Sequence, residues 1–276
     1  MTTVPRRTFL GAMAAGLAAC SANKFPAADS TLTASTNATT NPTTGSTSAM
    51  TGATVTAAPT TAITVAPTPS VTLAGAPARF LNKGDRGSGA VALTFHAAGR
   101  VDMANRLLDV IKRTGIPVTI FAVGEWIQAN PQLAKRIALD DHELANHTWS
   151  HGAMRTMTAA QLDTEVTKAA SALVGVSGSQ GRWFRPSQIE VPTDAILAAA
   201  GRAGYGLSVG YDVDSMDFQD PGAAAVRKNV IDNAQPGSII SLHFDHTDTI
   251  DALPAIVDHL QAKNWRAVTL SQMFPA

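Results

Sequence analysis

The sequence predicts an α/β fold, a distorted (β/α) barrel with about seven parallel strands, preceded by a disordered tether. Between residues 88 and 274, short apolar runs alternate with amphipathic segments, as expected for strands and helices around a mostly parallel sheet. Ionisable residues stand at the ends of several apolar runs, where barrel enzymes carry their functional groups. Seven short strands in about 190 residues favour a small, irregular barrel over an open sheet.

Composition divides the 276 residues into three parts. Residues 1–20 have the pattern of a signal peptide, residues 21–76 that of a linker, and residues 77–276 that of one globular domain large enough to bury a core. The formal net charge is zero, so there is no electrostatic case for nucleic acid as a partner.

The first 20 residues indicate export. Arg6 and Arg7 precede an apolar run from Phe9 to Ala19, which is shorter than the roughly 20 residues that span a bilayer. The Arg-Arg-x-Phe-Leu pattern resembles a twin-arginine signal, and "LAAC" resembles a lipobox with lipid on the sulfur of Cys20. A Sec-type signal with a chance cysteine is the alternative. We expect an exported lipoprotein held at the cell membrane, facing the envelope or extracellular space.

Residues 21–76 are dense in Thr, Ser, Ala and Pro and have few large apolar side chains. Such a segment cannot bury enough surface to offset the entropy of ordering it. It fits an O-glycosylated stalk and a plain disordered spacer equally well. Either would let an anchored domain reach material away from the membrane.

The predicted elements of the globular part follow in chain order. Strands are expected at Ala90–Phe95, Val118–Val123, Glu143–Asn146, Trp183–Arg185, Gly206–Tyr211, Ser238–His243 and Arg266–Thr269. Helices are expected at Met103–Thr114, Thr158–Val174, Thr193–Ala203, Ala223–Ala234 and Ile250–Lys263.

Chemically competent side chains follow five of these strands. They are His96, the pair His147 and His151, Arg185, the aspartates Asp212, Asp214 and Asp217, and the group His243, Asp245 and His246. The carboxyl ends of parallel strands share one face of a barrel, so five of the seven histidines should meet at one mouth.

These residue types suit metal-assisted hydrolysis. In "HTWSH", two imidazoles four residues apart would face the same way on a helical turn and could share a zinc ion whose bound water attacks a substrate. His243 is a general acid or a satisfied core histidine. Arg185 is expected to orient a carboxylate. The aspartates of "YDVDSMDF" could hold that arginine, orient His243 or cap the next segment.

The combined motifs resemble those of the polysaccharide deacetylases of the NodB-homology group, carbohydrate esterase family four, over about residues 88–274. "NHTWSH" after "DDHEL" matches the family's His-Thr/Ser-x-x-His motif in full. "FRPSQ" matches Arg-Pro-Pro in part, "DVDSMDF" has Phe218 for a tryptophan, and "SLHF" matches Leu-x-His loosely. Where the family has Thr-Phe-Asp-Asp-Gly, this chain has "TFHAAG".

The resemblance implies a NodB-like barrel and a hydrolase of non-peptide carbon–nitrogen bonds that removes N- or O-acetyl groups from peptidoglycan or another glycan. It implies Zn²⁺ or a similar divalent ion, held by one aspartate and two histidines. Carried over by position, His147 and His151 are the histidine ligands and His243 is the general acid. Arg185 orients the base, and Asp214 or Asp217 supports His243.

The first motif departs from the family, since His96 stands for the aspartate base and Ala97 for the aspartate ligand. Three outcomes follow. His96 becomes the third zinc ligand with His147 and His151. Or His96 is the base and another aspartate, Asp245 or Asp102, completes the metal site. Or metal and hydrolysis are both lost.

Two functions of different classes therefore stand side by side. One is a lipid-anchored, metal-assisted deacetylase of acetylated glycan. The other is a catalytically degenerate glycan-binding lipoprotein that reuses the barrel. A surface antigen in which the tether matters most is a weaker third. Metal content and the effect of a chelator on glycan binding separate the first two.

Overall fold

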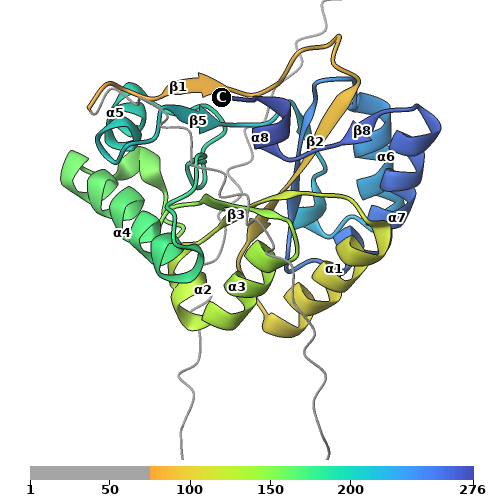
Figure 1. Cartoon of the computed structure of the whole chain (residues 1–276), viewed down its shortest axis with the longest axis horizontal. Helices are drawn as coiled ribbons and strands as arrows, with labels where there is room; N and C mark the ends of the chain where they lie inside the picture. Colours follow the sequence, from red (N-terminus) through yellow and green to blue (C-terminus); the bar gives the residue numbers. More distant parts are fainter. Residues whose placement is uncertain (1–74) are drawn as a thin grey trace, which may run out of the picture. The chain divides into compact units, whose positions relative to one another are not determined.

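The computed structural model describes residues 75–276. The predicted signal peptide, the lipidation site Cys20 and all but the last two residues of the predicted tether lie outside the described residues. Strands occupy the centre of the described part and helices lie around them (Figure 1). All pairings between the named strands are parallel, so the predicted α/β barrel is confirmed. Between residues 75 and 276, no helix is long and apolar enough to cross a bilayer.

The element bounds refine the predicted ones. The strands are β1 (Arg79–Leu81), β2 (Ala90–Ala97), β3 (Thr119–Ala122), β4 (Glu143–Asn146), β5 (Leu207–Val209), β6 (Val213–Asp214), β7 (Ile239–His243) and β8 (Arg266–Ala267). The helices are α1 (Val101–Thr114), α2 (Gly124–Ala129), α3 (Pro131–Leu139), α4 (Ala159–Ser177), α5 (Asp194–Arg202), α6 (Ala223–Asn233), α7 (Thr247–Ala262) and α8 (Leu270–Met273). Two 3₁₀ turns, η1 (Met154–Thr156) and η2 (Asp217–Gln219), complete the set.

The barrel is built from two strand groups. The larger has the order β4-β3-β2-β7-β6, with β8 paired to the start of β2, and the smaller pairs β1 with β5. Phe184 joins them, because it bridges Asn146 of β4 on one side and Ser208 of β5 on the other. The strand predicted at Trp183–Arg185 is wrong in extent: only Phe184 pairs, since Pro186 has no backbone N–H to continue a ladder.

Side-chain alternation along β2 separates a core face from a barrel face. Leu93 and Phe95 belong to the outer core, whereas Thr94 and His96 point the other way, into the barrel. The register with β7 places His96 opposite His243. The last residues of two apolar runs, 147 positions apart in the chain, thereby become neighbours.

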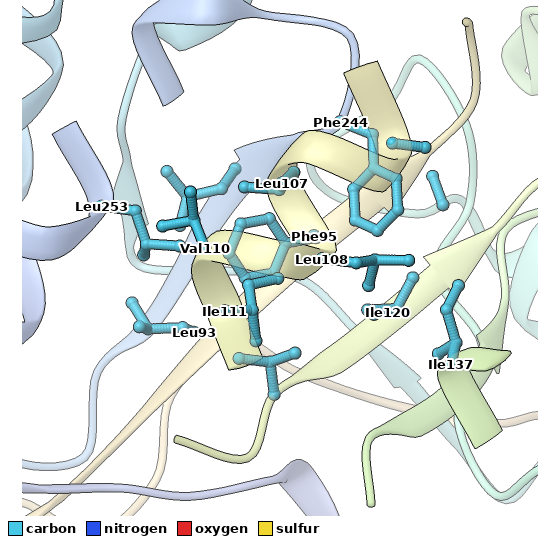
Figure 2. Packing of buried hydrophobic residues seen from close by; sticks show 14 of the residues in the cluster. Leu93, Phe95, Leu107, Leu108, Val110, Ile111, Ile120, Ile137, Phe244 and Leu253 are labelled. Atoms are coloured by element: carbon cyan, nitrogen blue, oxygen red, sulfur yellow. The ribbon is translucent and has the colours of Figure 1, made fainter. Parts of the chain in front are cut away.

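The main hydrophobic core lies between the sheet and its helices. Figure 2 shows Leu93 and Phe95 of β2 against Leu107 and Ile111 of α1, with Leu253 of α7 close by. All of these side chains are fully buried. Burial of each such side chain contributes about 1.5–3 kcal/mol, so the core fixes β2 and with it the position of His96.

Local sequence explains several helix limits. Thr158 and Gln161 form a reciprocal capping box at the start of α4. Gly115 ends α1 in the left-handed conformation, with φ of 67°. The segment between β3 and β4 holds two helices that were not predicted, because Pro131 interrupts their periodicity and starts α3.

Candidate active site

Five histidines lie together at the carboxyl ends of the strands, as predicted. The ring centroid of His96 is 4.4 Å from that of His147 and 4.5 Å from that of His243. His151 lies 4.9 Å from His147, and His246 lies 6.0 Å from His243. Strand register and strand polarity bring these rings to one mouth.

The segment that carries His147 and His151 is a loop and not the helical turn that the spacing suggested. Thr148 and His151 both have left-handed backbone conformations, with φ of 65° and 57°, which a helix excludes. Glu165 of α4 holds this loop. Its carboxylate accepts hydrogen bonds from the backbone N–H groups of Trp149 and Ser150, at 3.0 and 2.9 Å, and from the Ser150 hydroxyl.

Arg185 is buried under the mouth and has no carboxylate among its hydrogen-bond partners. Its guanidinium donates to the backbone carbonyls of Val209 and Gly210, each at 2.9 Å, and to the Thr94 hydroxyl at 3.0 Å. Of the three roles considered for the aspartates, holding this arginine by a hydrogen bond is therefore not observed. Burial lowers the pKa of Arg185 to about 9, so the side chain is still a cation at neutral pH.

The remaining partner of Arg185 is His96. Arg185 Nη1 lies 2.8 Å from His96 Nε2. An arginine can only donate, so His96 Nε2 carries the lone pair and Nδ1 carries the proton. Burial, reinforced by the neighbouring imidazoles, holds the pKa of His96 well below its ordinary value. His96 is therefore a neutral imidazole of defined tautomer.

His147 is the same tautomer as His96, with its proton on Nδ1. Its Nδ1 lies 3.0 Å from the backbone carbonyl of Arg185, and a carbonyl only accepts, so Nδ1 carries the proton. Its Nε2 is buried without any hydrogen-bond partner. Burial lowers the pKa of His147 well below the usual range, which keeps the Nε2 lone pair free.

Of the two aspartates expected to support His243, Asp217 makes the contact. Its carboxylate accepts from His243 Nδ1 at 2.6 Å, from the His243 backbone N–H at 2.7 Å and from the Thr249 hydroxyl at 2.6 Å. Burial alone would raise the pKa of Asp217, but these hydrogen bonds outweigh it and the pKa is lowered. An ionised Asp217 thus fixes the tautomer and orientation of His243.

The other aspartates serve different contacts. Asp214 accepts from the backbone N–H of Met216, and burial raises its pKa. Asp245 pairs with Arg100 at 3.0 Å. Asp102 lies exposed in the first turn of α1. Neither Asp245 nor Asp102 is placed to complete a metal site.

The donor set fits a catalytic zinc ion only in part. The orphaned Nε2 of His147, with His151 beside it, suits two of the three protein ligands that such a site needs. His96 Nε2 already accepts a hydrogen bond from the Arg185 guanidinium, and Ala97 has a methyl group where the resemblance implies a carboxylate. Within residues 75–276, no group of three or more His, Cys, Asp or Glu side chains is arranged to hold a metal. The residues present therefore do not fit the zinc site.

Two contributors to the site were missed at the sequence level. Thr94 stands two residues before His96 on the same face of β2, so strand alternation could have identified it. Glu165 is a buried charge beside the apolar stripe of α4, and that position is unusual for a carboxylate without partners. Its partner loop could not be read from the sequence.

The chain is similar in sequence to known polysaccharide deacetylases. A sequence profile of polysaccharide deacetylases matches residues 83–207. A peptidoglycan-N-acetylglucosamine deacetylase of Bacillus cereus is 30% identical over 188 residues, covering 67% of this chain and 68% of the relative. A chitooligosaccharide deacetylase of Bradyrhizobium is 27% identical over 207 residues, covering 70% of this chain and 94% of the relative.

Solved structures share the fold. One, of a peptidoglycan N-acetylglucosamine deacetylase bound to a hydroxamate-type benzamide, has a TM-score of 0.67 and 29% identity, covering 71% of this chain and 92% of that one. A carbohydrate esterase family four pseudoenzyme of Bacillus anthracis has a TM-score of 0.67 and 23% identity, covering 72% of this chain and 69% of that one. At that identity the second likeness concerns the fold alone.

Proposed function

The chain belongs to the polysaccharide deacetylase family, and from that premise we propose that it binds acetylated polysaccharide of the peptidoglycan or chitooligosaccharide class at its histidine-lined mouth, without zinc-dependent hydrolysis. The observation that carries the proposal is the 2.8 Å hydrogen bond from Arg185 to His96 Nε2. This hydrogen bond prevents His96 Nε2 from acting as a third metal ligand, and the methyl side chain of Ala97 cannot bind a metal. Relatives that act on such glycans support the choice of ligand class.

Charge supports the same conclusion. The family arrangement implied by the sequence motifs contains an arginine, a dication and two carboxylates, with a formal sum of about +1. With both carboxylates replaced and no metal, Arg185 alone leaves the same sum. A zinc ion added here would be repelled by the buried guanidinium of Arg185 without the two carboxylates that offset this repulsion in the family arrangement.

The first experiment measures binding of the full chain to chitotetraose and to its fully deacetylated counterpart by calorimetry, with and without EDTA. We expect binding of the acetylated ligand, weaker binding of the deacetylated one and no effect of EDTA. Loss of binding in the presence of EDTA, or no binding of the acetylated ligand in any condition, would overturn the proposal.

Deacetylation is the second candidate function, and the Asp217–His243 pair favours it, because a carboxylate-oriented imidazole suits a general acid. The test is release of acetate from the same oligosaccharide with zinc added. Zinc-stimulated release by the full chain would make this the function. Release lost in His243→Gln but kept in His259→Gln, a histidine on α7, would assign the acid.

Anchoring at Cys20 and export through the paired arginines are part of the proposal for cellular location. We expect lipid labelling and membrane fractionation to be lost in Cys20→Ser and export to fail when Arg6 and Arg7 are both replaced by lysine. Unchanged fractionation of Cys20→Ser would show that the chain has no lipid anchor there.

A further inference from the structure

The two ring nitrogens of His96 have different surroundings. Nε2 accepts from Arg185, whereas Nδ1 has no hydrogen-bond partner and is not among the enclosed, partnerless atoms of residues 75–276. Nδ1 therefore keeps contact with solvent at the mouth. Since Arg185 fixes the tautomer, the atom exposed to a ligand is an N–H group and not a lone pair.

This polarity is the reverse of what a catalytic base requires. A base presents a lone pair to the water that it activates, and the only lone pair of His96 faces a guanidinium at 2.8 Å. The neighbouring imidazole of His147 cannot replace it at the surface, because its Nε2 is enclosed. The expected role of His96 as base or zinc ligand thus conflicts with the geometry.

We propose that His96, held by Arg185, is a specificity-determining hydrogen-bond donor whose Nδ1–H binds the carbonyl oxygen of the ligand's acetyl group. This inference rests on the proposed glycan-binding function and names the group recognised. Arg185 is the positioning residue, since it touches His96 and not the ligand. Little conformational entropy is lost when the Nδ1–H aligns with the carbonyl, because packing and the hydrogen bond from Arg185 already fix the ring.

The test compares His96→Asn with His96→Leu. Both variants lose the bond from Arg185, but an asparagine amide can donate from the position of Nδ1, whereas leucine only fills the volume. For chitotetraose we expect the affinity of His96→Asn to lie within about threefold of that of the native chain. We expect His96→Leu to lose about 10–100-fold in affinity, because the acetyl carbonyl is then left without its hydrogen-bond donor. For the deacetylated oligosaccharide the two variants should bind alike.

A second readout is independent of binding. Long-range ¹H–¹⁵N correlation spectra of the native full chain at neutral pH should show His96 protonated at Nδ1 only. Protonation at Nε2, or equal affinities of the asparagine and leucine variants for chitotetraose, would overturn the inference. If the native chain binds no acetylated glycan at all, the proposed function fails instead, and the tautomer measurement still decides whether His96 is a donor.

Discussion

Replacing Asp217 by asparagine tests whether the buried carboxylate organises the mouth. Asp217 is completely buried and accepts three hydrogen bonds of 2.6–2.7 Å from His243 and Thr249. The amide oxygen of asparagine can keep the two partners of Oδ2, but its NH₂ group faces the Nδ1–H of His243. The imidazole must then change tautomer, and one charge-assisted bond is lost.

The expected loss follows from those contacts. A hydrogen bond to a charged acceptor contributes about 1.5–3 kcal/mol, and the two bonds that remain become ordinary neutral ones. We therefore expect Asp217→Asn to lower the free energy of unfolding by about 2–3 kcal/mol near pH 7. The matched control is Asp220→Asn, which breaks the Asp220–His246 pair, in which the aspartate is 68% exposed. Exposed pairs contribute about 0–1 kcal/mol.

The pH dependence carries a sign that can be checked. The pKa of Asp217 is lowered on folding, so its stabilisation is present above the unfolded carboxyl pKa of about 3.9 and disappears as pH falls through the lower folded value. Urea unfolding should give a constant difference between the native chain and Asp217→Asn from pH 8 to pH 5, which shrinks below about pH 4. Equal losses in the two variants, or a difference that grows in acid, would refute the reasoning.

Two further predictions concern positions around the site. Glu165→Ala removes the acceptor that holds the 147–151 loop, so we expect faster hydrogen exchange at the amides of Trp149 and Ser150 and a free energy of unfolding lower by about 1–3 kcal/mol. The control Glu125→Ala, at an exposed position, should change neither quantity. Unchanged protection of those two amides in Glu165→Ala would contradict the prediction. Gly201→Ala would place a Cβ 1.8 Å from the Ala76 carbonyl oxygen, so it should lower the thermal midpoint of unfolding. Gly175→Ala has open space around the new Cβ and should raise the free energy of unfolding by up to about 1 kcal/mol. A shift of both variants in the same direction would show that helix propensity, and not the contact at Ala76, determines the effect.

The sequence predicted the parts of this molecule that depend on local pattern. Alternating apolar runs gave the barrel, and strand polarity brought the histidines to one mouth. Strand β4 was predicted at its observed bounds, Glu143–Asn146. Register could not be predicted, because it depends on which strand β2 meets, and β7 lies far along the chain.

The chemistry of individual side chains was harder to predict for the same reason. The i, i+4 spacing of His147 and His151 suggested a helix, but Glu165 and the left-handed residues Thr148 and His151 make a loop. Arg185 was expected to meet a carboxylate and instead meets carbonyls, a hydroxyl and an imidazole. Such partners come from distant strands, and no local signal specifies them.

The pairing of β2 with β7 has a consequence for synthesis. The hydroxyl of Thr94 donates to the carbonyl of Ile240, which follows it by 146 residues. At about 5–20 residues per second, a ribosome needs about 7–30 s to make that interval. Throughout that time β2 has an apolar face and lacks its β7 partner along one edge. A strand with an unpaired edge can pair with other chains. The central strand of the barrel is therefore open to aggregation while the rest of the polypeptide is being made.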